Sequence, residues 1–176
     1  MRIGFGYDVH ALAPGETLII GGVVLEHDRG TVAHSDGDVL THAIIDALIG
    51  SVAAGDIGSH FPDTDEKWRG ADSIDLLKEI SHKLKQSGYR IGNIDSTVVL
   101  QQPRLRPHID AMRSNIAGAL DIGVDDVSIK ATTTEGLGPE GRQEGVAAYA
   151  VCLVVRDEGP RTQDEGPRTQ DAGRQE

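Results

Sequence analysis

Cysteine, aromatic residues and long apolar runs are all scarce in this sequence. The single cysteine, Cys152, excludes an internal disulfide framework and favours a reducing compartment. Because Cys152 lies in an apolar, strand-like run, we expect it to be a small buried hydrophobe. No run approaches the roughly 18 apolar residues of a membrane span, and Asp8 follows the N-terminus too closely for a signal peptide. These absences predict a soluble, cytoplasmic protein without membrane partners.

Positive charge is also in short supply. The chain carries 17 lysine and arginine residues against 28 acidic ones, giving a net charge of −11, and 3% of its residues are aromatic. Nucleic-acid binding depends on basic patches and aromatic stacking platforms, so this composition argues against it. An anionic small molecule is a candidate ligand only where metal ions or local basic residues offset the charge of the protein.

The length indicates one domain followed by a tail of different character. A chain of 176 residues can fold as a single domain with a substantial core, which we place at residues 1–155. Residues 156–176 contain the heptapeptide DEGPRTQ twice in tandem and almost no apolar residues. They are therefore predicted to form a disordered extension.

Metal-ligand residue types occur close together near the N-terminus. Residues 2–10 alternate as a strand, so Asp8 and His10 leave it on the same face. Such a pair, taken alone, is typical of a hydrogen-bonded strand end. A third candidate ligand, His42, lies on a predicted helix, and three protein ligands with an open fourth position are the arrangement of a catalytic zinc site.

The predicted helix lies within residues 34–65. Ser35 or Asp36 suits its N-cap, and apolar residues recur at helical spacing to give a buried stripe: Val39, Leu40, Ala43, Ile44, Ala47 and Leu48. On another face, three polar residues stand four apart: Asp38, His42 and Asp46. Such a row alone is typical of a solvated helix face. The nearby strand pair and the acidic loop that follows the helix favour a metal site instead.

Further elements follow from apolar periodicity and turn signals. We expect a hairpin that turns on Gly21-Gly22, two amphipathic helices at 73–86 and 107–120, and three strands at 91–100, 127–133 and 146–155. This order predicts a single α+β domain with a mixed four-stranded sheet and helices on one face. Identical subunits are expected to cover the other face of the sheet, to which we assign Val98, Val146 and Val151.

The segment Lys130–Gly136 carries a candidate phosphate site. Three threonine hydroxyls and the backbone N–H groups after a strand suit phosphate oxygens. Glu135 in the same segment suits a hard cation. Threonines are also ordinary strand residues, so the prediction depends on the other motifs.

Five motifs together identify a family. They are DVH at Asp8–His10, HSDGDV at His34–Val39 with His42, GDIG at Gly55–Gly58, FPDTD at Phe61–Asp65 and KATTTEGLG at Lys130–Gly138. In this order they closely resemble the 2-C-methyl-D-erythritol 2,4-cyclodiphosphate synthase family, and the resemblance runs from Met1 to about Val155.

The resemblance implies an activity, an assembly and two kinds of metal ion. It implies a phosphorus–oxygen lyase that converts 4-diphosphocytidyl-2-C-methyl-D-erythritol 2-phosphate to the 2,4-cyclodiphosphate and CMP in the non-mevalonate isoprenoid pathway. It implies a homotrimer with sheets facing the three-fold axis and a site at each subunit boundary. Zinc would be bound by Asp8, His10 and His42, and magnesium or manganese by Glu135.

The resemblance also implies substrate contacts. The methylerythritol part would contact Asp46, Asp56, Gly58 and Asp63, and the substrate phosphates would lie by His34 and Ser35. The cytosine pocket would comprise Leu100, Pro103, Arg104, Leu105, Arg106 and Ala131, and the CMP phosphates would be held by Thr132 and Thr133. Further substrate contacts are implied for Asp8, His10, Phe61, Asp65, Thr134, Glu135 and Arg142.

Catalysis in this interpretation is mainly positioning and charge neutralisation, because the attacking 2-phosphate and the diphosphate belong to one molecule. His34 and Thr133 would donate hydrogen bonds to oxygens that gain charge. Asp46 would orient the zinc ligands from outside the coordination shell.

One position departs from the family pattern. Relatives often carry an aromatic residue where this chain has Pro139, close to Arg142 and Glu144 on the implied trimer axis, and this change predicts weak binding of isoprenoid diphosphates there. Two rival functions stay open at this stage. One is a zinc-dependent phosphohydrolase that uses metal-bound water. The other is a non-catalytic trimeric binder of cytidine nucleotides or isoprenoid diphosphates.

Overall fold

The computed structural model describes residues 1–157. Its strands are β1 (Arg2–Pro14), β2 (Leu18–Ile20), β3 (Val23–Leu25), β4 (Arg29–Thr31), β5 (Tyr89–Val99), β6 (Val127–Thr132) and β7 (Gly145–Arg156). Its α-helices are α1 (Val39–Ser51), α2 (Ile57–His60), α3 (Ser73–Gln86), α4 (Ile109–Leu120) and α5 (Gly138–Gly141). Short 3-10 turns occupy Glu66–Trp68, Arg106–His108 and Val124–Asp126. The predicted tail lies outside the described residues from position 158 onward.

The main sheet is mixed, with strand order β4-β1-β7-β5-β6. Among the strands of residues 1–157, only the β5–β6 pair is parallel, and α4 makes the crossover between these two strands. The predicted α+β class and mixed sheet are confirmed, and the apolar β7 lies at the centre of the sheet. The prediction of four strands was wrong by one, because β1 continues to Pro14 and its last residues pair with Arg29–Thr31, a segment too short and polar to read as a strand.

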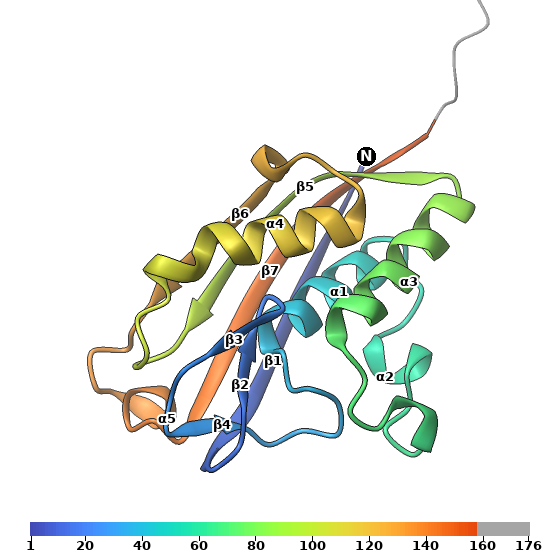
Figure 1. Ribbon diagram of the computed structural model, residues 1–176. Coiled ribbons are helices and arrows are strands. Elements are labelled where there is room, and N and C mark those ends of the chain that lie inside the picture. The colour runs from blue at the N-terminus through green and yellow to red at the C-terminus, as the bar shows by residue number, and fades with distance from the viewer. Residues whose placement is uncertain (158–176) are drawn as a thin grey trace, which may run out of the picture.

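Three long helices cover one face of the sheet, as Figure 1 shows. Helix α1 packs directly on β1 and β7, and α3 packs on α1 and α4. Nearly every residue of α1 is buried, because the helix lies between the sheet and α3 and is apolar on almost all sides. Helices α3 and α4 have the predicted apolar stripes, apart from Ile74, which is only half buried.

The close packing of α1 on β1 depends on two glycines. A Cβ at Gly4 would overlap the carbonyl oxygen of Ala47, and a Cβ at Gly6 would overlap that of Ala43. Both glycines lie on the even-numbered side of β1, which also carries Asp8. The helix backbone therefore rests on the strand backbone with no side chain between them.

The helix α1 begins later than predicted. Its N-cap is Asp38 rather than Ser35 or Asp36. The Asp38 carboxylate is fully buried and accepts hydrogen bonds from the backbone N–H groups of Gly21, Gly22 and Thr41 and from the Thr41 hydroxyl. Asp38 is thus a structural cap that joins the β2–β3 turn to α1, and it does not belong to the polar row in which we had placed it.

The other face of the sheet is open and apolar. Val98 and Val146, predicted on this face, are fully buried under the helices, whereas Val151 is 44% exposed as predicted. The side chains on the open face alternate with the helix-facing ones along β1 and β7: Ile3, Phe5, Tyr7, Val9, Tyr149 and Val151. The rings of Tyr7 and Tyr149, which are paired across the strands, lie 5.0 Å apart. A contiguous apolar patch of this kind marks an interaction surface.

Several local predictions are confirmed. The hairpin of β2 and β3 turns on Gly21-Gly22 with positive φ at both glycines. Cys152 is buried, and its Sγ donates to the Ala47 carbonyl. Two segments predicted as loops each contain a one-turn helix, α2 and α5, which are too short to show helical periodicity.

The glycine contact gives a direct test of the packing. Replacing Gly6 with Ala should lower the free energy of unfolding by about 3 kcal/mol, because the new methyl group forces α1 away from β1. Gly50→Ala is the matched control: its Cβ would come no closer than 3.9 Å to any neighbour, so stability should stay the same or rise by up to about 1 kcal/mol. Urea denaturation of both variants measures the difference, and equal stability would contradict the proposed contact.

Candidate functional site

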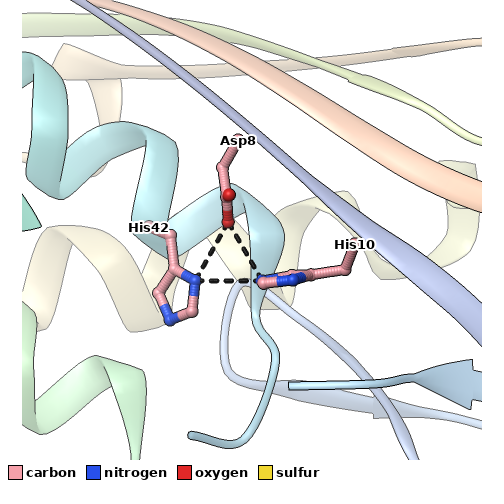
Figure 2. Close-up of side chains that lie close together, drawn as sticks. All are labelled: Asp8, His10 and His42. Atoms are coloured by element: carbon pink, nitrogen blue, oxygen red, sulfur yellow. Dashed lines mark hydrogen bonds and ion pairs between the residues drawn. The ribbon is translucent and has the colours of Figure 1, made fainter. Parts of the chain in front are cut away.

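Asp8, His10 and His42 come together in a triangle, as Figure 2 shows. Asp8 Oδ2 lies 3.0 Å from His10 Nε2 and 3.0 Å from His42 Nδ1, and the two nitrogens are 3.1 Å apart. The alternation of β1 turns Asp8 and His10 to the helix side, and the first turn of α1 carries His42 toward them. The sequence prediction that these three residues meet at one point is confirmed.

The triangle suits a metal ion. In a tetrahedral site with bonds of 2.0–2.1 Å, neighbouring ligand atoms are separated by about 3.3 Å. The three edges of the cluster are only slightly shorter than this, so small movements would admit an ion. One carboxylate and two imidazoles are also a donor set that zinc and similar ions accept.

The charges within the cluster are strongly coupled. Burial raises the pKa of Asp8, but hydrogen bonds from His10 and His42 outweigh this effect and hold the pKa well below its usual range. Burial lowers the pKa of His42, but the hydrogen bond to Asp8 outweighs it and raises that pKa. Both shifts favour the charged forms of the two side chains, and a metal ion bound at Nδ1 of His42 would displace the proton that this nitrogen shares with Asp8.

The second nitrogen of His42 is also engaged. Its Nε2 lies 2.9 Å from Ser73 Oγ and 3.1 Å from Ser35 Oγ. The Ser73 hydroxyl in turn donates to Asp36. From the sequence, Asp36 was expected only as a helix cap and Ser73 only at the start of a helix, because no spacing pattern links the start of α3 to a residue of α1.

A hollow of about 340 Å³ opens beside the cluster. It brings together many of the predicted site residues with apolar neighbours, and is lined by Asp8, His10, Ala33, His34, Ser35, His42, Ile57, Gly58, Phe61, Asp63, Trp68 and Leu76. The buried Nε2 atom of His34 has no hydrogen-bond partner among the residues that the structure describes. A buried nitrogen without a partner is costly unless a ligand or a loop movement satisfies it.

A second hollow, of about 230 Å³, lies where β5 and β6 end. The predicted cytosine-pocket residues line it together with two of the threonines: Leu100, Gln101, Pro103, Arg104, Leu105, Arg106, Ala131, Thr132 and Thr133. The parallel pairing of the two strands puts their carboxyl ends at one edge and so joins these two distant segments. Among residues 1–157, none lines both hollows.

Three predicted acidic site residues bond to backbone N–H groups instead of lining either hollow. Asp46, which we expected to orient the metal ligands, accepts from Ile57 N at 2.7 Å and so holds the start of α2. Asp56 caps α2 by accepting from Ser59 N, and Asp65 caps the following 3-10 turn. Burial raises the pKa of Asp46, although the Ile57 bond opposes the rise.

The remaining predicted residues lie in the loop after β6 and in α5. Glu135 has a positive φ of 54° and accepts from the Thr133 hydroxyl at 2.8 Å. Thr134 donates to the Leu137 carbonyl. Arg142 forms a bidentate ion pair with Glu144, and Pro139 is exposed in the first turn of α5. In one chain, none of these residues contacts the Asp–His–His cluster through a hydrogen bond or ion pair recorded for residues 1–157.

The fold and the cluster define a small α+β protein with a three-ligand site suited to a transition-metal ion. Within residues 1–157, none of the helices has the length and hydrophobicity required to cross a bilayer.

Comparison with known proteins identifies the family. A model of the YgbB family matches residues 1–155. The 2-C-methyl-D-erythritol 2,4-cyclodiphosphate synthase of Salinibacter ruber is 58% identical over 154 residues, which cover 88% of this chain and 98% of that protein. The chain therefore belongs to the YgbB family, and the resemblance inferred from its motifs is confirmed.

Solved structures agree with this assignment. The bifunctional IspDF from Campylobacter jejuni matches with a TM-score of 0.84 and 42% identity, covering 87% of this chain and 42% of that one. A 2C-methyl-D-erythritol-2,4-cyclodiphosphate synthase described as a CDP-bound form matches with a TM-score of 0.81 and 36% identity, covering 88% of this chain and 100% of that one.

Proton competition at the cluster should make metal binding depend on pH. Because the pKa of His42 is raised by Asp8, lowering the pH increases the fraction of protonated His42 and should weaken zinc binding, by up to about tenfold per pH unit for one displaced proton. Titration calorimetry at several pH values, in buffers of different ionisation enthalpy, measures both the affinity and the released protons. An affinity that is unchanged between neutral and mildly acidic pH would exclude His42 as a ligand.

Proposed function

We propose that the protein converts 4-diphosphocytidyl-2-C-methyl-D-erythritol 2-phosphate to 2-C-methyl-D-erythritol 2,4-cyclodiphosphate and CMP, as a phosphorus–oxygen lyase of isoprenoid precursor synthesis in the cytoplasm. The observation that carries the proposal is the Asp8–His10–His42 triangle beside a hollow, in a chain 58% identical to a protein named for this reaction. In the reaction, an oxygen of the 2-phosphate bonds to the β-phosphorus, and the bond from that phosphorus to the bridging oxygen breaks to release CMP.

The cluster would hold zinc through Asp8, His10 and His42, and Glu135 would hold magnesium or manganese. These ions, when bound, supply Lewis-acid contacts and neutralise the charge of the phosphates. The donor geometry supports zinc at the cluster, since the triangle is close to the size of a tetrahedral face. The proposal of a second cation is supported by the exposed carboxylate of Glu135, which lies in the threonine-rich loop after β6.

The protein's own part in the reaction is to fold the substrate and to stabilise developing charge. His34 lines the hollow beside the cluster and has a nitrogen without a partner in the described part of the chain, so it is suited to donate to a phosphate oxygen. Thr133 lines the other hollow, and its hydroxyl, which here donates to Glu135, would donate to a phosphate oxygen in the complex. Gly58 and Asp63 border the first hollow and would contact the methylerythritol part.

The hollow at the ends of β5 and β6 would bind the cytidine part. Its lining comes from the loop between Leu100 and Arg106 and from residues Ala131 to Thr133 at the end of β6, and backbone groups of these segments would recognise the base. A relative of the same fold has been solved in a form described as bound to CDP.

We further propose a homotrimer in which the open faces of the sheets turn toward the three-fold axis. The support is the apolar patch on β1 and β7, which would otherwise expose Phe5, Tyr7 and Tyr149 to water. Since the two hollows of one chain share no lining residue in the described part of the sequence, a substrate that fills both would be bound most simply between neighbouring subunits.

The reaction can be tested directly. The purified chain, supplied with zinc, magnesium and the CDP-linked substrate, should release CMP and the cyclic diphosphate in equal amounts, measured by phosphorus NMR. His42→Ala should lower the rate about 100-fold or more, because it removes a ligand of the cluster. The matched control is His82→Ala, since His82 is exposed on α3, and it should have the wild-type rate.

Two outcomes would overturn this proposal. A linear monophosphate product instead of the cyclic diphosphate would indicate a zinc phosphohydrolase. Tight cytidine nucleotide binding without any turnover would indicate a non-catalytic binder.

The assembly has its own test. Analytical ultracentrifugation at micromolar concentration should give a species of three times the 18.7 kDa chain mass. Phe5→Asp puts a charge in the apolar patch and should shift the population to monomer, whereas Val24→Asp, at a similarly exposed position on β3, should remain trimeric. A wild-type chain that sediments only as monomer would contradict the trimer.

A further inference from the structure

We propose that Ser73 is a positioning residue that fixes the orientation of the His42 ring, and that Asp36 anchors Ser73 in this role. The inference rests on the proposed use of Asp8, His10 and His42 as metal ligands. It assigns a function to two residues outside the ligand triangle, at the start of α3 and in the loop before α1.

The contacts form a single chain of hydrogen bonds. His42 Nε2 lies 2.9 Å from Ser73 Oγ, and Ser73 is fully buried. The Ser73 hydroxyl contacts Asp36 Oδ1, and the backbone N–H of Ser73 donates to Asp36 Oδ2 at 2.9 Å. Asp36 therefore accepts hydrogen bonds from both the hydroxyl and the backbone N–H of Ser73. This leaves the lone pairs of Ser73 Oγ turned toward His42.

The Asp36 carboxylate, at one end of this series of hydrogen bonds, sets the direction of each bond in the series. An ionised carboxylate can only accept hydrogen bonds, so the Ser73 hydroxyl must donate its one proton to Asp36. Ser73 Oγ can then only accept from His42, and this requires a proton on Nε2. A neutral imidazole has one proton. Once a metal ion has displaced the proton that Nδ1 of His42 shares with Asp8, Nδ1 therefore carries the free lone pair, on the side that faces Asp8 and His10.

Ser35 does not supply the same constraint. Its Oγ is also near Nε2, at 3.1 Å, but its other recorded contact is with the N–H of Gly37 at 3.4 Å. No carboxylate within the described residues sets the direction of the Ser35 hydroxyl through a recorded bond. Ser35 also lines the hollow beside the cluster, where its hydroxyl is available to a ligand.

The network also links two helices at the metal site. Asp72 caps α3 by accepting from Ile74 N, so Ser73 is held both by its helix and by Asp36. The ring of His42, carried by α1, is thereby tied to the start of α3. Outer partners of metal-ligating histidines typically contribute 10–100-fold in metal affinity by fixing the ring and its tautomer.

The test compares zinc affinity in three full-length chains by competition with a chromogenic chelator. Ser73→Ala removes the hydroxyl but keeps the backbone bond to Asp36, so it should weaken zinc binding by about 10–100-fold. Ser81→Ala is the matched control: Ser81 is a buried serine on the same helix whose hydroxyl donates to the Leu120 carbonyl. It should bind zinc as the wild type does, although both variants lose a buried hydrogen bond.

Each result has a definite consequence. If Ser73→Ala binds zinc as tightly as Ser81→Ala while the wild type binds it well, the positioning role is wrong and the proposed metal site stands. If the wild type itself does not bind zinc, the proposed metal site is wrong, and the role of Ser73 falls with it.

A second measurement needs no variant. Nitrogen-15 NMR of the zinc-loaded wild-type chain should show a His42 ring with metal at Nδ1 and a slowly exchanging proton at Nε2. Metal at Nε2 of His42, or a proton at Nε2 that exchanges as fast as in an exposed histidine, would overturn the proposal even if Ser73→Ala failed to fold.

Discussion

The contact between the backbones of α1 and β1 is the constraint on which the rest of the structure depends. Gly4 and Gly6 leave no side chain in the space occupied by the carbonyls of Ala47 and Ala43. The same side of β1 continues past the glycines to Asp8 and His10, and His42 immediately precedes Ala43 in α1. If side chains separated the helix from the strand, the helix would lie farther away and His42 could not reach Asp8 and His10. The packing of α1 on β1 and the assembly of the metal-type cluster therefore depend on the same close approach of the two backbones.

Main-chain N–H groups engage many of the carboxylates around the site. Five carboxylates around the cluster and its loops accept hydrogen bonds from main-chain N–H groups: Asp36, Asp38, Asp46, Asp56 and Asp65. Each one begins a helix or turn, or fixes the loop that carries His34 and Ser35. Carboxylates held in this way stabilise local structure and are less available to repel a ligand. This explains how a chain with a net charge of −11 can present a site suited to an anionic substrate.

From the sequence we could predict the features that depend on the periodicity of apolar and polar residues or on local chemistry. The period of two along β1 predicted that Asp8 and His10 share a face, and helical periodicity predicted α3 and α4 closely. Features set by tertiary packing were not predictable in this way. The cap at Asp38 depends on the distant Gly21-Gly22 turn, and the side of the sheet on which Val98 lies depends on strand register. Ser73 meets His42 only because α3 packs on α1, and nothing in the spacing of 31 residues indicates this contact.

The alternation of β1 couples the proposed assembly to the site. The even-numbered positions of the strand put Asp8 and His10 on the helix side, and the odd-numbered positions put Tyr7 and Val9 on the open side. Subunits that pack on the open face would restrict the same short stretch of backbone that holds two of the three cluster residues. A strand fixed on both faces has little freedom to splay, so the proposed trimer would preorganise the cluster as well as bury apolar surface. In this arrangement the interface acts on the metal site through the backbone of one strand, without contributing a ligand.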